Sequence, residues 1–134
     1  MAAVVQLRSA PLPFIGAIAV HCWFVVIDEG TGEAHRWEVW QTKNAGGRSF
    51  GHVHCDLKAP GDGVGGGPSR IATQWHGDEA DAIVAVLGNI EAYPHCARYT
   101  VWPGPNSNSF VAWVLKKAGI RPRLGWRAHG ARYN

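Results

Sequence analysis

The sequence of 134 residues lacks the paired cysteines that a disulfide-stapled domain requires. Its three cysteines are an odd number, and none belongs to a Cys-x-x-Cys pair. Small secreted domains that depend on disulfides carry several paired cysteines. The cysteine content therefore favours a reducing compartment, and we expect a cytoplasmic location.

A long uninterrupted apolar run is also missing. The most apolar segment, residues 11–27, contains two prolines, Gly16 and His21. A bilayer-spanning helix needs about 20 apolar residues without such interruptions. We expect this segment to be one buried, extended strand and predict no membrane span.

Strong charge of either sign is absent. The net charge is +3, and the basic residues are spread from Arg8 to Arg132, whereas nucleic-acid binding needs a dense basic face. We therefore expect no nucleic-acid partner. After Lys116, arginines alternate with Trp126 and Tyr133, which indicates either a solvated tail or a weak anion-binding surface.

What the sequence does contain is ample material for one core. Apolar residues make up 46% of the chain and include seven tryptophans. This length and composition predict a single domain over residues 1–134. The glycine run at 65–67 lacks the lysine and hydroxyl of a phosphate-binding loop, and we expect no cofactor.

Strand and turn signals predict an early β-hairpin. Residues 15–28 and 35–42 are rich in β-branched and aromatic side chains, and the turn-forming residues 29–32 separate them. A four-residue loop would place His21 opposite Trp40 with Glu38 diagonally adjacent on the same face, whereas a loop of odd length would place His35 there.

The rest of the chain predicts loops and two helices. We expect residues 44–69 to be mainly loop with a short strand over 50–57, and a helix over 79–92 capped by Asp78. A short extended segment over 98–102 should lead into a last helix. Together these elements predict an α+β fold, with an antiparallel sheet whose early hairpin packs against two helices.

The run Pro-Gly-Pro-Asn-Ser-Asn-Ser-Phe at residues 103–110 is the most informative stretch. Its prolines and glycine form a rigid turn, and Lys116, Lys117 and Gly119 mark the end of the helix that follows. Ser107 therefore lies at or within one residue of a helix N-terminus. In that position it is either a helix cap or a nucleophile.

A nucleophilic serine needs a general base, because its hydroxyl is almost fully protonated near neutrality. His21 is the candidate base, with Glu38 or His35 to orient it; helix N–H groups would stabilise the oxyanion. The candidate substrate-binding or oxyanion-binding residues are Asn106, Asn108 and Trp102. In the simpler alternative, His21 is a core histidine and Glu38 pairs with Arg36.

Each cysteine follows a histidine, at positions 21–22, 54–55 and 95–96, which raises the question of zinc. Neighbouring residues on a strand point to opposite faces, so each pair offers only one donor to a shared centre. The spacings match no recognised zinc arrangement. We therefore expect no metal.

These residues resemble a bacterial protein family, domain-of-unknown-function family 3750. The resemblance rests on His21-x-Trp23, the stretch 36–39, the helix at 77–90, Tyr93-Pro94, Tyr99, the run 102–112 and Ala128-x-Gly130. Ser109 departs from that family's usual threonine, and 130–133 departs from its usual Gly-Lys-Asp-Tyr.

A more distant likeness is to circularly permuted papain-like domains, such as lecithin retinol acyltransferase and the PPPDE peptidases. In these an early-strand histidine precedes a cysteine that heads a later helix, and Ser107 stands in the place of that cysteine. The likeness implies a papain-like fold and the hydrolysis or transfer of an amide, ester or thioester acyl group. Because serine cannot form the thiolate–imidazolium pair, an inactive module that binds a peptide, an acyl group or a protein is the alternative.

Overall fold

Six strands form one sheet in the order β4-β5-β3-β2-β1-β6, and every neighbouring pair is antiparallel. The computed structural model describes residues 2–13, 15–16, 18–45 and 48–133. The strands are β1 (Ala3–Pro11), β2 (Val20–Asp28), β3 (Ala34–Val39), β4 (Arg48–Phe50), β5 (Val53–Cys55) and β6 (Arg70–Trp75). The helices are α1 (Gly77–Leu87) and α2 (Ser107–Lys117), with short 3₁₀ turns at Val64–Gly66 and Ile90–Ala92. The predicted α+β fold with an antiparallel sheet and two helices is confirmed.

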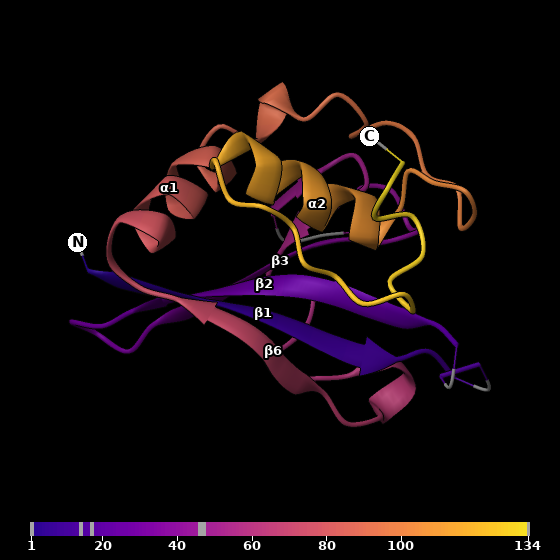
Figure 1. Cartoon of the computed structure of the whole chain (residues 1–134), viewed down its shortest axis with the longest axis horizontal. Coiled ribbons are helices and arrows are strands. Elements are labelled where there is room, and N and C mark those ends of the chain that lie inside the picture. The colour runs from indigo at the N-terminus through magenta and orange to yellow at the C-terminus, as the bar shows by residue number, and fades with distance from the viewer. Residues whose placement is uncertain (1, 14, 17, 46–47, 134) are drawn as a thin grey trace.

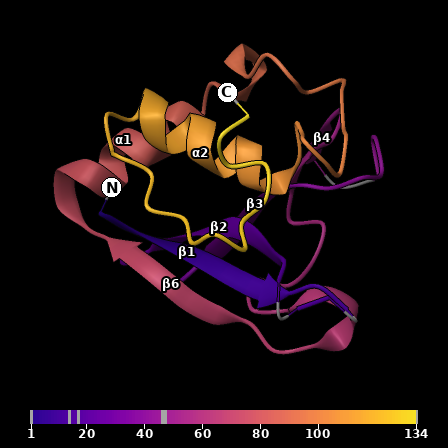
Figure 2. The ribbon, with the colours of Figure 1, turned by 45° about the vertical axis from the view of Figure 1, so that its right-hand side comes forward.

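Both α-helices cover the same face of the sheet (Figures 1 and 2). Phe24 of β2 packs against Phe110 of α2 in the main core, where α1 contributes Ile83 and Leu87. On the opposite face, Trp23 and Val25 form a smaller cluster with Ala10. This alternation along β2 puts His21, near the start of the strand, on the same side as Trp23.

The β2–β3 hairpin has the register predicted for a four-residue loop. Phe24 pairs with Trp37 and Ile27 with Ala34. Asp28 Oδ1 accepts hydrogen bonds from the amides of the loop residues Gly30 and Thr31, the local bonding that makes aspartate a turn residue. The same register brings the rings of His21 and Trp40 into an edge contact 4.8 Å apart.

Strand predictions were wrong at the N-terminus. Residues 11–27 are not one strand, because β1 ends at Pro11 and β2 begins only at Val20. Pro11 lacks an N–H and Pro13 follows two residues later, so the strand cannot continue through this stretch. The true first strand carries the alternation of buried Val5 and Leu7 with half-buried Gln6 and Arg8.

Two further segments differ from the prediction. Residues 98–102 form no strand, because they lie outside the sheet and their backbone bonds to the turn, as in Thr100 N–H to Pro105 O. Helix α1 begins at Gly77, so Asp78 lies in its first turn and does not cap it. The helix ends at Leu87 because Gly88 and Asn89 are poor helix formers.

The C-terminal segment runs back along α2 to the N-terminal end of that helix (Figure 1). Ser109 Oγ donates to Gly130 O, and Asn108 Nδ2 donates to His129 O. These bonds fix the tail beside the first turn of α2. Within the described ranges, no helix is long and apolar enough to cross a bilayer.

Candidate functional site

The N-terminus of α2 is capped by Asn106 and not by Ser107. Asn106 Oδ1 accepts hydrogen bonds from Asn108 N (3.0 Å) and Ser109 N (3.2 Å), and Ser109 Oγ accepts one from Asn106 N (3.1 Å). This reciprocal arrangement is a capping box. Ser107, the first residue of the helix, is therefore not needed as a cap.

Ser107 carries a hydroxyl that no described residue engages in a hydrogen bond, although only 7% of the residue is exposed. Its side chain lies in the wall of a cavity of about 480 Å³. The hydroxyl oxygen is not one of the fully enclosed polar atoms that lack a partner in the described part of the chain, so it is open to the cavity. The free hydroxyl of Ser107 is thus available to a molecule in the cavity.

His21 lines the same cavity, and its ring is hydrogen-bonded to the buried carboxylate of Glu38. His21 Nε2 lies 2.8 Å from Glu38 Oε1, and the two residues are 2% and 0% exposed. Arg36 Nη2 donates to the same carboxylate oxygen at 2.9 Å, and Arg36 Nε lies 2.7 Å from Glu38 Oε2 in an ion pair that is poorly aligned for a hydrogen bond. Glu38 therefore both orients His21 and pairs with Arg36.

Further contacts hold the Arg36 guanidinium in place beside the Glu38 carboxylate. Its Nη1 donates to the carbonyls of Ala59 and Asp62, and its guanidinium lies 3.9 Å from the ring centroid of Trp23. Such bonds and the stacked ring compensate for burying the charge. The result is a fixed Arg36–Glu38–His21 chain that ends at the cavity.

Burial lowers the pKa of His21 below 6.5, although the hydrogen bond and charge of Glu38 act in the opposite direction. Burial alone would raise the pKa of Glu38, but its bonds to His21 and Arg36 and their charges bring that pKa below its usual value. Near neutral pH, His21 is neutral and Glu38 is ionised. An ionised Glu38 accepts a hydrogen bond from the Nε2–H group, so the proton stays on Nε2 and the lone pair is on Nδ1.

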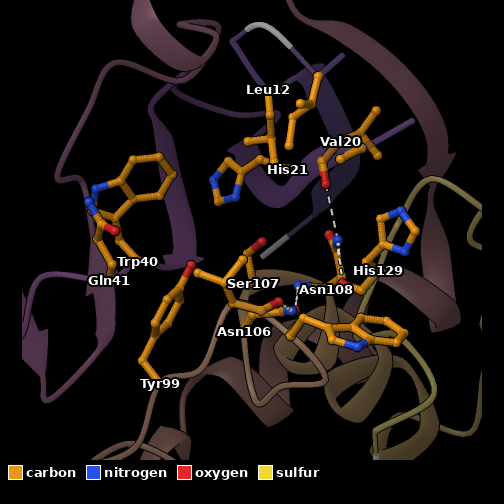
Figure 3. Close-up of a pocket in the computed structure, with 14 residues that line it drawn as sticks. Leu12, Val20, His21, Trp40, Gln41, Tyr99, Asn106, Ser107, Asn108 and His129 are labelled. Atoms are coloured by element: carbon orange, nitrogen blue, oxygen red, sulfur yellow. Dashed lines mark hydrogen bonds between the residues drawn. The ribbon is translucent and has the colours of Figure 1, made fainter. Parts of the chain in front are cut away.

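The cavity has mostly apolar walls, to which Leu12, Ile15, Val20, Trp40, Val101 and Trp102 contribute. His21 enters it from the strand side and Ser107 from the end of α2 (Figure 3). No hydrogen bond among the described residues joins the two side chains. The two groups thus share one cavity without a hydrogen bond between them.

The amides of Asn106 and Asn108 are engaged by backbone carbonyls. Asn106 Nδ2 donates to Val101 O, and Asn108 Nδ2 donates to Val20 O and His129 O (Figure 3). These acceptors fix the orientation of the Asn108 amide and leave its buried Oδ1 without a hydrogen-bond partner. Both asparagines line the cavity, but their N–H₂ groups are occupied in holding α2, β2 and the tail together.

His35 lies away from this site. It is 37% exposed at its side chain, and its Nδ1 lies 2.6 Å from Asp56 while its Nε2 lies 2.9 Å from Glu33. In the described part of the chain, His35, Cys55 and Asp56 place ligand atoms within 4.8 Å of one another. Arg48 lies 3.1 Å from the Cys55 sulfur, and burial raises the pKa of that thiol to about 11, so this cluster is a poor match for a cation.

Several cavity residues were not singled out by sequence reasoning. Trp40, Gln41, Tyr99 and His129 all line the cavity. Of these, only Trp40 was positioned beforehand, by the hairpin register. The strand predicted over 35–42 ends at Val39, so Gln41 lies in an irregular segment, as do Tyr99 and His129. In such segments no periodicity predicts the direction of a side chain.

Comparison with known protein families gives a match that spans nearly the whole chain. No curated protein and no solved structure matches. A family described as "Protein of unknown function (DUF3750)" matches residues 2–133. The resemblance noted in the Pro-Gly-Pro-Asn-Ser-Asn run and the early hairpin is therefore a true relationship, and the chain belongs to family DUF3750.

Proposed function

We propose that this protein is a serine-type hydrolase or acyltransferase with a papain-like arrangement, in which Ser107 replaces the usual cysteine. The observation that carries the proposal is the unengaged Ser107 hydroxyl, which lines one cavity with a histidine held by a buried carboxylate. Nucleophile, base and orienting acid then come from α2, β2 and β3 respectively. The substrate is an ester, amide or thioester with an apolar acyl group, because the cavity walls are mostly apolar.

In the proposed reaction, Ser107 Oγ forms a bond to the acyl carbonyl carbon while its proton passes to His21 Nδ1. The proton crosses the gap through one water or after a small side-chain movement, since catalytic hydrogen bonds often tighten only when substrate binds. The tetrahedral intermediate then expels the alcohol, amine or thiol, which receives the proton from His21. Water or a second acceptor then attacks the acyl group bound to Ser107 while its proton passes to His21. The acyl group leaves on that acceptor, and His21 returns the proton to Ser107.

The oxyanion would be held by the backbone N–H of Ser107. The N–H groups of Asn108 and Ser109 already donate to the cap, whereas that of Ser107 has no partner among the described residues. A helix N-terminus favours negative charge at this point. Gln41, on the cavity wall, is a candidate second donor.

The proposal is tested by labelling with a fluorophosphonate that carries an alkyl chain. The wild-type protein should be labelled, and Ser107→Ala should abolish labelling while the circular dichroism spectrum is unchanged. Ser69→Ala is the matched control, because Ser69 bonds to Arg8 and Gly61 outside the cavity. Labelling of Ser107→Ala at the wild-type rate would refute the assignment of the nucleophile.

A module that binds but does not react is the second candidate. It is favoured by the absence of a His21–Ser107 hydrogen bond and by the high pKa of a serine hydroxyl. It predicts no labelling of the wild type, together with a rise in melting temperature on addition of a fatty acid or acylated peptide. Ligand at a hundredfold excess over Kd stabilises a folded protein by about 2.7 kcal/mol.

A further inference from the structure

Exposed apolar side chains gather around the mouth of the cavity. Seven large apolar residues are exposed in the described part of the chain, and three of them, Ile15, Val101 and Trp102, line the cavity. Two more, Ile18 and Trp126, lie on the segments beside it. Trp102 and Trp126 are 67% and 71% exposed. A contiguous apolar surface of this kind usually marks an interaction site.

Hydrogen bonds and a ring contact join the three segments that carry these residues into one surface, which we call the rim. His129 Nε2 lies 2.6 Å from Ile18 O, and Arg127 donates to Gly16 O at 2.8 Å. The ring of Trp102 packs edge-on against His129 at 5.6 Å. All three segments lie at the right-hand end of the molecule in Figure 1.

The charge of the rim has one sign. Residues 92–134 contain seven lysines and arginines and no aspartate or glutamate, and residues 1–27 contain no acidic residue either. Arg132 lines a second hollow together with Trp102 and Trp126, and Arg123 and Arg127 line another with Trp126. The acid behind the cavity, Glu38, is neutralised by Arg36. The rim therefore combines apolar side chains with the positive charge of Arg127 and Arg132.

We propose that the rim docks on an anionic membrane surface, with the mouth of the cavity facing the lipid. Tryptophan favours the boundary between acyl chains and headgroups, and arginine beside it pairs with lipid phosphates. Single-stranded nucleic acid fits less well, because Ile15, Ile18 and Val101 cannot stack on bases as aromatic rings do. A second copy of the chain also fits less well, since two basic rims would repel each other.

The test is co-sedimentation with vesicles of equal parts phosphatidylcholine and phosphatidylglycerol. The wild type should bind them, bind phosphatidylcholine vesicles weakly, and lose binding as salt is added. The double variant Ile18→Ala/Trp126→Ala should bind about tenfold more weakly or worse, and Arg132→Gln about fivefold more weakly. Ile71→Ala on β6 is the matched control, since it removes an isoleucine of similar exposure, 47%, and should change nothing.

Ser107→Ala should bind vesicles like the wild type, so docking can succeed or fail independently of the proposed catalysis. Failure to bind anionic vesicles, equal weakening by Ile71→Ala, or tighter binding to a single-stranded oligonucleotide would each overturn the proposal. A change from dimer to monomer in Trp126→Ala without loss of vesicle binding would assign the rim to self-association instead.

Discussion

Glu38 decides which nitrogen of His21 carries the proton. As a carboxylate it only accepts hydrogen bonds, so it holds the proton on Nε2 and leaves the lone pair on Nδ1. In Glu38→Gln the new amide can donate to Nε2 and drive the proton to Nδ1, where it blocks the base. We expect the rate of phosphonate labelling to fall about a hundredfold or more, as for loss of a general base.

His35→Gln is the control for that change. His35 was the alternative orienting residue, but it pairs with Asp56 and Glu33 near the surface, and its replacement should leave the labelling rate unchanged. Because Glu38→Gln also leaves the buried Arg36 without its anionic partner, its fold is checked by urea unfolding, with Glu38→Asp as the milder variant. Equal labelling by Glu38→Gln and the wild type would contradict this role.

At the scale of the element, the start of α2 depends on one asparagine side chain. Asn106→Ala removes the bonds to Asn108 N and Ser109 N and frees Val101 O. Loss of a cap of this type costs about 1 to 2 kcal/mol of unfolding free energy. Asn89→Ala is the matched control: Asn89 precedes the 3₁₀ turn Ile90–Ala92 but makes no side-chain capping bond, so its loss should stay within about 0.5 kcal/mol.

Both free energies are measured by urea unfolding. If Asn106→Ala were no more destabilised than Asn89→Ala, the capping role would be wrong.

Gly130 packs tightly against the capping side chain. Its φ is +95°, and a Cβ there would collide with the Asn106 amide. The tail, the cap and the cavity wall are thus one packed unit.

The elements that could be predicted from the sequence are those marked by turn-forming residues or by a clear pattern of apolar side chains. The turn residues 29–32 predicted the hairpin, but its register was left open between two loop lengths; the structure has the four-residue loop, which brings His21, Trp40 and Glu38 together. The strands β1 and β6 were missed for different reasons. The alternation of Val5 and Leu7 is present but stands beside a more apolar stretch, whereas β6 is an edge strand that buries only Trp75.

The site was predictable only in part. Two adjacent residues, Asn106 and Ser107, are both good caps, and sequence alone could not say which one held the helix and which one faced the cavity. The convergence of Gln41, Tyr99 and His129 on the cavity depends on irregular backbone and on the returning tail. Such long-range packing leaves no periodic signal in the sequence.

For the whole molecule, the buried pair makes stability depend on pH. His21 is neutral when folded and its pKa is lowered by burial from 6.5, so the unfolded chain takes up a proton first as pH falls. The contribution of His21 to the free energy of unfolding is therefore complete above pH 6.5 and is lost as pH falls below that value. The slope of this loss is at most about 1.4 kcal/mol per pH unit. The lowered pKa of Glu38 also makes the free energy of unfolding fall with pH, in the range below its usual value of 4.5.

His35 has the opposite sign, since its hydrogen bond to Asp56 raises its pKa and its contribution is lost as pH rises; because it is exposed, that effect is small. The unfolding free energy of the wild type should therefore fall between neutral pH and about pH 5. In His21→Gln this fall should shrink, because no buried imidazole remains to resist protonation, whereas His35→Gln should keep it. Parallel pH curves for His21→Gln and the wild type would mean that His21 is not held neutral in the folded protein, and the direction of proton transfer proposed for Ser107 would lose its physical basis.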